Sequence, residues 1–155
     1  MASQKIQFAK AEMLIRKPID LVFQAFINPK ITTKFWFTKS SGELKEDEKT
    51  EWTWEMYNRS ISVVTKKIEP NKKILIEWTN YSDLTTVEWN FKSLGENSTF
   101  VSIINYGFEE NSDKTIESVR GSTEGFTLVL AGLKAYLEHN IELNLVSDRF
   151  PKGIE

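Results

Sequence analysis

Hydrophobic residues recur at helical spacing between Thr115 and His139, in the stretch TIESVRGSTEGFTLVLAGLKAYLEH. Polar side chains, among them Arg120, Glu124 and Lys134, fall on one arc of a helical wheel at roughly 100° per residue. The opposite arc is apolar and consists of Phe126, Val129, Leu130, Leu133, Tyr136 and Leu137. This pattern predicts a long amphipathic helix over residues 115–139, with its apolar face turned to the core.

Three glycines, Gly121, Gly125 and Gly132, share one strip of this helix beside the apolar arc. A glycine inside a helix costs roughly 1 kcal/mol relative to alanine, so the strip needs a physical reason. Two reasons are open. Either another backbone approaches the helix closely there, or the helix leaves unfilled space beside it.

Between residues 38 and 107 the hydrophobic period changes from that of a helix to that of a strand. Apolar and polar residues alternate in the segments 50–57, 73–79, 86–93 and 100–106. Strict alternation predicts an antiparallel sheet with one buried face and one wet face. Turn residues such as Ser41-Gly42 and Pro70-Asn71 separate the segments by hairpin-length connections, which predicts a meander.

The N-terminal part completes the predicted fold. Residues 6–16 are a plausible first strand, and Pro18 suits the first turn of a helix over residues 18–27. A second short helix over residues 30–35 leads into Phe35-Trp36-Phe37. The predicted class is α+β: a curved antiparallel sheet of about six or seven strands wrapped around the long C-terminal helix. We expect a single domain over residues 1–155.

Large aromatic residues crowd the predicted inner face of this sheet, and the covering helix carries the glycine strip. Large rings hold a helix away from a sheet, and small helix residues leave volume unfilled, so the pair favours an elongated apolar cavity. Dense packing of the same rings into an ordinary core is the competing interpretation. We expect the cavity to be lined by Phe35, Trp36, Trp52, Trp54, Trp78, Trp89, Phe91, Tyr106, Gly125, Phe126, Val129 and Leu130.

Composition and charge exclude several classes of function. The net charge of −2 over 155 residues provides no basic footprint for nucleic acid. Cysteine is absent and His139 is the only histidine, so we expect no metal site and no cofactor. No segment resembles a signal peptide or a membrane span, so we expect a cytoplasmic protein without membrane insertion.

Candidate catalytic groups are few. Glu55, Glu77 and Glu88 alternate with the apolar residues of their strands, which predicts that they face solvent. The polar side chains expected to face inward are Ser102 and Tyr106, which form hydrogen bonds rather than transfer protons near neutral pH. Phosphate-binding glycine loops are also absent. The sequence contains no recognisable catalytic constellation and favours a function other than catalysis.

Four stretches resemble a known family: KPIDLVFQAFINPKITTKFW, VVTKKIEPNKKILIEW, EGFTLVLAGLKAYLE and the terminal DRFP. Through them the chain is similar to the START-like, helix-grip superfamily (SRPBCC), in the branch of activator of heat-shock-protein ATPase homologues. The resemblance implies one strand, two short helices, six strands and a long helix, the order that the periodicity also predicts. It further implies an apolar or amphipathic small molecule held between the sheet and the C-terminal helix.

Three functions are therefore considered. The first is a binding protein for a small apolar or amphipathic molecule. The second is a protein-interaction module, acting as a homodimer or on a chaperone partner, as the resemblance to ATPase activators implies. The third is a cyclase or hydrolase in the same cavity, which requires convergent ionisable groups that the sequence does not display.

Overall fold

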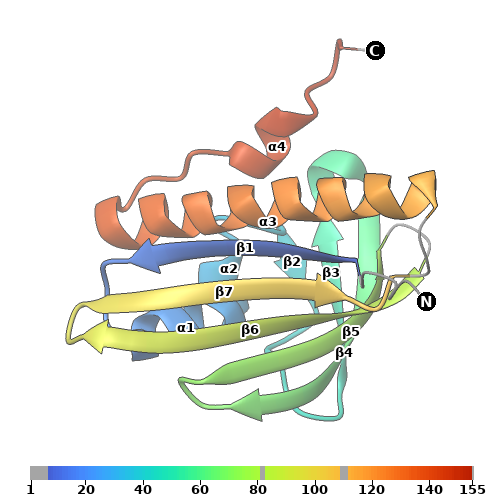
Figure 1. Ribbon diagram of the computed structural model, residues 1–155. Helices are drawn as coiled ribbons and strands as arrows, with labels where there is room; N and C mark the ends of the chain where they lie inside the picture. The colour runs from blue at the N-terminus through green and yellow to red at the C-terminus, as the bar shows by residue number, and fades with distance from the viewer. Residues whose placement is uncertain (1–6, 81–82, 109–111, 155) are drawn as a thin grey trace.

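The computed structural model describes residues 7–80, 83–108 and 112–154 (Figure 1). Its strands are β1 (Phe8–Ile15), β2 (Lys39–Ser40), β3 (Lys49–Trp54), β4 (Arg59–Glu69), β5 (Lys73–Asn80), β6 (Asp83–Gly95) and β7 (Ser98–Tyr106). Its helices are α1 (Ile19–Ile27), α2 (Pro29–Thr32), the 3₁₀ turn η1 (Glu55–Tyr57), α3 (Asp113–His139) and α4 (Leu145–Arg149). None of the helices in these ranges is long and apolar enough to cross a membrane.

The strands form one seven-stranded antiparallel sheet in the order β1-β7-β6-β5-β4-β3-β2. Strands β2 to β7 follow one another as a meander, and β1 pairs with the last strand, β7. The register places Trp78 of β5 opposite Val63 of β4, and Trp89 of β6 opposite Ile103 of β7. All four side chains are buried on the inner face. The alternation in the sequence thus becomes one continuous buried face.

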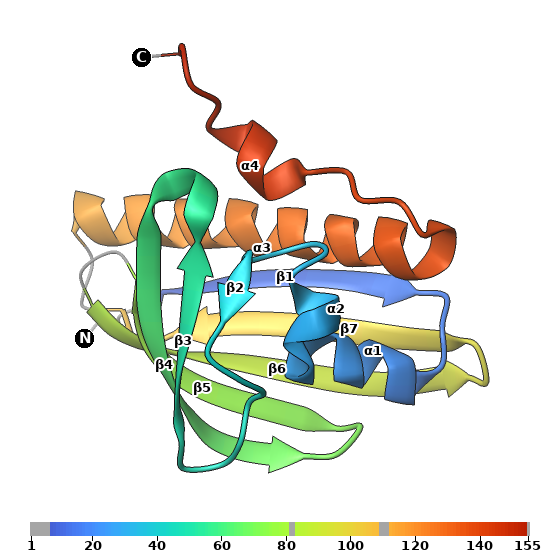
Figure 2. The same cartoon turned by 180° about the vertical axis from the view of Figure 1, so that it is seen from behind.

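The helices cover this inner face from two sides. Figure 2 shows α1 and α2 lying over one part of the sheet. The long helix α3 covers another part and runs along β1. Phe26 of α1 packs against Trp89 and Phe91 of β6, with ring centroids 5.7 Å and 6.0 Å apart. The predicted helix-grip fold is confirmed by this arrangement of a curved sheet around a long C-terminal helix.

Several boundaries differ from the predicted ones by one to three residues; for example, α3 begins at Asp113 rather than at residue 115. The first strand begins at Phe8, and the start predicted for it at residue 6 lies outside the described residues. The second short helix ends at Thr32 rather than at residue 35. The prediction that the strand over residues 50–57 extends through Met56 is wrong: β3 ends at Trp54, because η1 and the left-handed Asn58 (φ 50°) turn the chain into β4.

Trp36 occupies the centre of the core, although it belongs to the irregular segment that follows α2. Its ring centroid lies 4.9 Å from that of Trp52 and 5.7 Å from that of Phe126 on α3. Phe37 stacks on Trp52 at 4.6 Å. Tilted and edge-on aromatic pairs of this kind stabilise beyond their buried area. Much of the aromatic set is therefore solid core between the sheet and the helices.

Glu138, whose side chain is 9% exposed, joins the C-terminal end of α3 to the residue that follows β1. Its carboxylate accepts hydrogen bonds from the backbone N–H of Arg16 at 2.8 Å and from the Lys134 ammonium at 2.7 Å. Burial alone would raise the pKa of Glu138, but these two donors outweigh it and hold the pKa below its ordinary value.

We expect Glu138→Gln to lower the free energy of unfolding by about 1–2 kcal/mol near neutral pH, because hydrogen bonds to a charged group are lost. The pKa of Glu138 is depressed in the folded state. Its contribution is therefore present above the unfolded pKa of about 4.3 and disappears as the pH falls through the folded value. Urea denaturation of both proteins from about pH 3 to pH 8 measures the difference, which should shrink in acid.

Glu142→Gln is the matched control, because Glu142 is exposed and makes none of the hydrogen bonds or ion pairs found among the described residues. It removes the same charge without disturbing the contacts with Arg16 and Lys134, and about no change in stability is expected. A difference between wild type and Glu138→Gln that stays constant down to strongly acidic pH would contradict the assignment.

Candidate functional site

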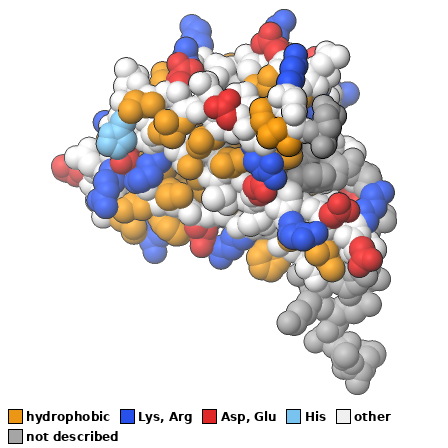
Figure 3. Space-filling view, turned by 90° about the horizontal axis from the view of Figure 1, so that it is seen from above, with side chains coloured by type: hydrophobic (Ala, Val, Ile, Leu, Met, Phe, Trp, Pro, Cys, Tyr) orange, Lys and Arg blue, Asp and Glu red, His pale blue; other side chains and the backbone are white. Residues whose placement is uncertain are grey.

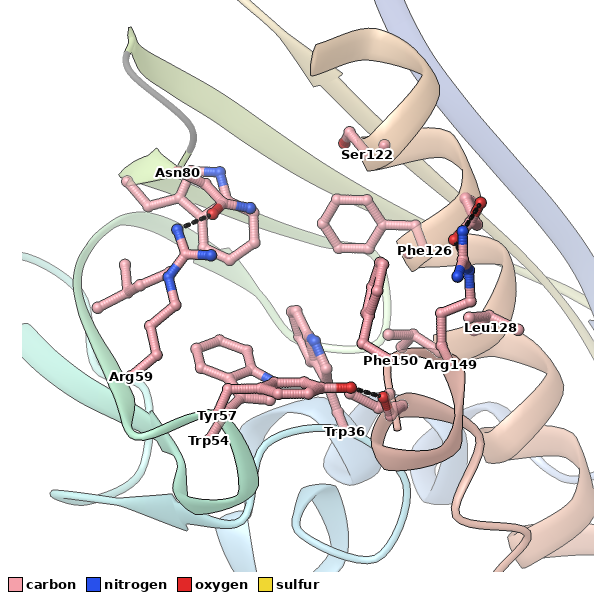
Figure 4. A pocket seen from close by; sticks show the side chains of 17 residues that line it. Trp36, Trp54, Tyr57, Arg59, Asn80, Ser122, Phe126, Leu128, Arg149 and Phe150 are labelled. Atoms are coloured by element: carbon pink, nitrogen blue, oxygen red, sulfur yellow. Dashed lines mark hydrogen bonds and ion pairs between the residues drawn. The ribbon is translucent and has the colours of Figure 1, made fainter. Parts of the chain in front are cut away.

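A pocket of about 310 Å³ opens between the β3–β4 hairpin, the end of β5, α3 and α4 (Figure 4). This volume lies at the small end of the range of about 300–1,000 Å³ found for sites that bind small molecules. The side chains and backbone that form its wall are Trp36, Trp54, Tyr57, Arg59, Ile61, Trp78, Asn80, Gly121, Ser122, Glu124, Gly125, Phe126, Leu128, Val129, Val146, Arg149 and Phe150.

The inner end of the pocket is aromatic. Phe126 of α3 stacks on Trp78 of β5 with ring centroids 5.9 Å apart and planes inclined by 30°. Trp36 meets both rings edge-on, at 5.7 Å from Phe126 and 6.2 Å from Trp78. These side chains are held by the core behind them, so the apolar surface that they present is already formed without a ligand.

The outer wall is made by the C-terminal segment. The hydroxyl of Tyr57 donates a hydrogen bond to the carbonyl of Val146, and the ring of Phe150 packs edge-on against the Tyr57 ring at 6.2 Å. Burial raises the pKa of Tyr57 further above neutrality, so its hydroxyl is protonated and donates at neutral pH. Helix α4 is thereby latched to the β3–β4 hairpin.

A second latch joins α4 to α3. The guanidinium of Arg149 forms an ion pair with Glu124, and its central carbon lies 4.3 Å from the centroid of the Phe150 ring. The ion pair raises the pKa of Arg149. Together the two latches hold α4 over the pocket, where Figure 4 shows Arg149 and Phe150 beside Phe126.

Polar groups gather at two places on the wall. On the strand side, the Arg59 guanidinium donates to the Asn80 side-chain oxygen at 2.7 Å. On the helix side, the Ser122 hydroxyl donates at 2.8 Å to the side-chain oxygen of Asn105, whose own amide donates to Thr85 at 2.9 Å. Asn105 is only 1% exposed, and this network supplies the partners that a buried amide needs.

The glycine strip of α3 serves both purposes that the sequence left open. A Cβ added at Gly132 would lie 3.2 Å from the Cβ of Phe35 and 3.3 Å from its carbonyl oxygen, so Gly132 permits the close approach of that backbone. A Cβ added at Gly125 would meet nothing within 4 Å, and Gly125 lies in the pocket wall. One glycine accommodates the backbone of another segment, and the other leaves open space.

The two alanine variants should therefore change stability in opposite directions. Gly125→Ala gains helix propensity without a clash, so we expect the free energy of unfolding to rise by about 0.5–1 kcal/mol. Gly132→Ala gains the same propensity but presses on the backbone of the buried Phe35, and overpacking of this kind costs about 1–3 kcal/mol. Urea denaturation of the two variants measures the contrast. Equal stabilisation of both would show that Phe35 yields without cost.

Half of the side chains predicted to line a cavity lie in the wall of this pocket: Trp36, Trp54, Trp78, Gly125, Phe126 and Val129. Five others are buried in the core away from it: Phe35, Trp52, Trp89, Phe91 and Leu130. Trp52 is closed off by the stacked Phe37, and Phe91 lies beneath Phe23 and Phe26 of α1. The space is accordingly shorter than the elongated cavity that the sequence favours.

Tyr106 requires a correction, because it lies on the outer face of β7 and not in the pocket wall. Its hydroxyl donates to Glu88 at 3.4 Å, and burial followed by the Glu88 charge raises its pKa. Ser102 also faces outward and donates to Glu12. Both faces of β7 carry apolar residues, so alternation alone could not say which face is inner. Pairing of Ile103 with the buried Trp89 decides it.

Several wall residues were not predicted from the sequence. Tyr57, Arg59 and Asn80 lie at strand ends or in turns, where the period-2 pattern stops. Val146, Arg149 and Phe150 belong to the C-terminal segment, whose only signal was the DRFP stretch of the family resemblance. Gly121 and Ser122 could have been found, since Gly121 belongs to the glycine strip and Ser122 lies about one turn before Phe126.

Two indole donors in the described part of the chain, those of Trp78 and Trp89, are buried without a hydrogen-bond acceptor. An unmade hydrogen bond of a buried donor costs about 1–3 kcal/mol. Aromatic rings surround both groups, which is the packing reason for their isolation. Over the described ranges there is no cluster of three His, Asp or Glu side chains placed to hold a metal ion.

The curved sheet gripped around α3, with a pocket between them, defines a START-like helix-grip protein. The chain belongs to the family described as activator of Hsp90 ATPase homolog 1-like proteins, whose model matches residues 16–138. A search of the curated proteins returned no match.

Solved structures share the fold at low sequence identity. The protein SSP2350 from Staphylococcus saprophyticus is 24% identical, with a TM-score of 0.76 over 88% of this chain and 96% of that one. The Aha1 dimer from Colwellia psychrerythraea is 17% identical, with a TM-score of 0.74 over 86% of this chain and 98% of that one. CalU16 from Micromonospora echinospora is 13% identical, with a TM-score of 0.68 over 96% of this chain and 93% of that one.

Proposed function

We propose that this protein binds a small apolar or amphipathic molecule in the pocket between the sheet, α3 and α4. The observation that carries the proposal is the open space beside Gly125, which faces the aromatic surface of Trp36, Trp78 and Phe126. A preformed apolar concavity with a few polar groups at its edge is the usual form of a small-molecule site. The helix-grip fold supports the same reading.

The chemistry of the wall favours binding over catalysis. Glu124 is the one carboxylate among the described wall residues, and it is engaged by Arg149. The Tyr57 hydroxyl is likewise occupied, since it donates to the carbonyl of Val146. A cyclase or hydrolase would need a general base poised near neutral pH within reach of the reacting atom. We therefore assign the pocket to binding.

Fluorescence titration with N-phenyl-1-naphthylamine, a neutral apolar probe, tests the proposal. We expect saturable binding with one probe per chain and quenching of tryptophan emission. Native mass spectrometry of the freshly purified protein provides an independent test, in which a small molecule should be retained on the 18.0 kDa chain and released on denaturation. Absence of saturable probe binding together with a bare chain in the mass spectrum would overturn the proposal.

A second candidate is a protein-interaction function, acting as a homodimer or on a chaperone. It is favoured by the family description and by the apolar side chains exposed after α3, namely Ile141, Leu143 and Phe150. Figure 3 looks onto this face, where hydrophobic side chains are interspersed with charged ones. Stimulation of the ATPase of an Hsp90-type chaperone tests the chaperone role. Sedimentation tests the dimer, and a monomer without effect on the ATPase would remove this candidate.

A further inference from the structure

The charge at the edge of the pocket is not balanced. The ionised side chains in its described wall are Arg59, Arg149 and Glu124. Arg149 and Glu124 neutralise one another as an ion pair. Arg59 has a neutral partner instead, the side-chain oxygen of Asn80, and forms no ion pair with any carboxylate in the described ranges. Among the described residues, the wall thus carries one positive charge that no carboxylate pairs with.

The Arg59 side chain has donors to spare. A guanidinium presents five N–H groups in a planar fork, and the bond to Asn80 engages its Nη2 nitrogen. Figure 4 shows the side chain reaching from β4 toward Asn80, on the side of the pocket opposite Phe126 and Phe150. The remaining donors are available at the pocket edge. A fork of this shape matches a carboxylate or sulfonate, which can accept two parallel hydrogen bonds.

Two tryptophans line the pocket near Arg59. Trp54 precedes the turn that leads to Arg59 and is its register partner across the β3–β4 hairpin, and Trp78 lies two residues before Asn80. Both rings line the same pocket as Arg59, whose side chain is exposed to solvent at the pocket edge. A ligand whose apolar body covers these rings displaces water from the pocket edge, and the attraction between its acid group and the guanidinium grows as the local dielectric constant falls.

We infer that the natural ligand is an organic anion, with an apolar, ring-bearing body against Trp36, Trp78 and Phe126 and a single acid group bound by Arg59. This inference rests on the proposed binding function and specifies the chemical class of the ligand. Asn80 holds the guanidinium in position through the 2.7 Å hydrogen bond. Arg59 is the residue that selects an acid over a neutral molecule of the same shape.

A matched pair of probes tests it: 1-anilinonaphthalene-8-sulfonate and N-phenyl-1-naphthylamine, which share a ring system and differ in the sulfonate. We expect Arg59→Gln to weaken sulfonate binding about tenfold and to leave binding of the neutral probe within about twofold. Arg59→Lys keeps the charge but loses the fork and should fall between wild type and Arg59→Gln. Added salt should lower the affinity for the sulfonate probe and leave the affinity for the neutral probe unchanged.

Arg120→Gln is the control, since it makes the same charge change on α3 at an exposed residue outside the pocket wall. It should affect neither probe. If the neutral probe binds and Arg59→Gln leaves sulfonate affinity unchanged, the inference about Arg59 is wrong and the binding function stands. Equal loss with Arg120→Gln and Arg59→Gln also overturns it, because net charge would then be the cause. If neither probe binds wild type, the binding function and this inference both fail.

Discussion

Replacement of Gly125 by leucine is expected to weaken binding of N-phenyl-1-naphthylamine by at least about tenfold, a loss of about 1.4 kcal/mol or more. An added Cβ at this position has no neighbour within 4 Å, so the leucine side chain extends into the pocket of about 310 Å³. The fold should tolerate the change, because leucine is a better helix former than glycine. Fluorescence titration provides the affinity, and urea denaturation shows that the variant is folded.

Gly42→Leu is the matched control for this experiment. Gly42 lies in the exposed loop after β2, and a Cβ there also meets nothing within 4 Å. The same side chain is thus added far from the pocket, and probe affinity should not change. Unaltered affinity in a folded Gly125→Leu variant would mean that the probe binds elsewhere.

Removal of the Trp36 side chain is expected to lower the free energy of unfolding by about 3–5 kcal/mol, the usual cost of truncating a buried tryptophan to alanine. Trp36 is 7% exposed, and its ring bridges three parts of the core: Phe26 of α1, Trp52 of β3 and Phe126 of α3. The space left behind would open into the pocket on one side and be bounded by packed elements on the others, so it could collapse only in part. Urea denaturation of Trp36→Ala measures the loss.

Two further variants provide the comparison for the loss of stability in Trp36→Ala. Trp36→Phe retains a ring in the same place and should recover part of the stability. Leu94→Ala removes a side chain that is 56% exposed at the end of β6 and should change stability by less than about 0.5 kcal/mol. A loss below about 1 kcal/mol for Trp36→Ala would contradict the central position of this ring in the core.

The elements with strong periodicity could be predicted from the sequence. The apolar arc of Phe126, Val129, Leu130 and Leu133 is the buried face of α3, and these residues occur at helical spacing whatever the rest of the chain does. The same holds for Val87, Trp89 and Phe91 of β6, which alternate strictly and are all buried. In both cases local geometry alone decides which side chains share a face.

The site was only partly predictable, because pairing and irregular segments decide it. The two faces of β7 are almost equally apolar, so the placement of Tyr106 depended on the register with β6. Trp36 lies in a segment without repeating structure, and no periodicity could place its ring among those of the sheet. The hydrogen bond between Tyr57 and Val146 joins residues far apart in the sequence. No pattern in the sequence around either residue predicts that the two meet.

The glycine strip illustrates the same limit within one helix. Gly125 and Gly132 lie on the same side of α3 and are indistinguishable on a helical wheel. Their roles differ because the segment carrying Phe35 reaches α3 at Gly132 and no described atom occupies the space beside Gly125. Such a difference is a property of the tertiary structure.

The indole N–H signals of the five tryptophans, followed by two-dimensional NMR during titration with N-phenyl-1-naphthylamine, test the central claim most directly. Trp36, Trp54 and Trp78 line the pocket, whereas Trp52 and Trp89 are 1% exposed and lie in the core behind it. We predict that the first three signals shift with saturable dependence on probe and that those of Trp52 and Trp89 shift least. Shifts of similar size at all five tryptophans, or none at the three in the wall, would contradict a ligand site between the sheet, α3 and α4.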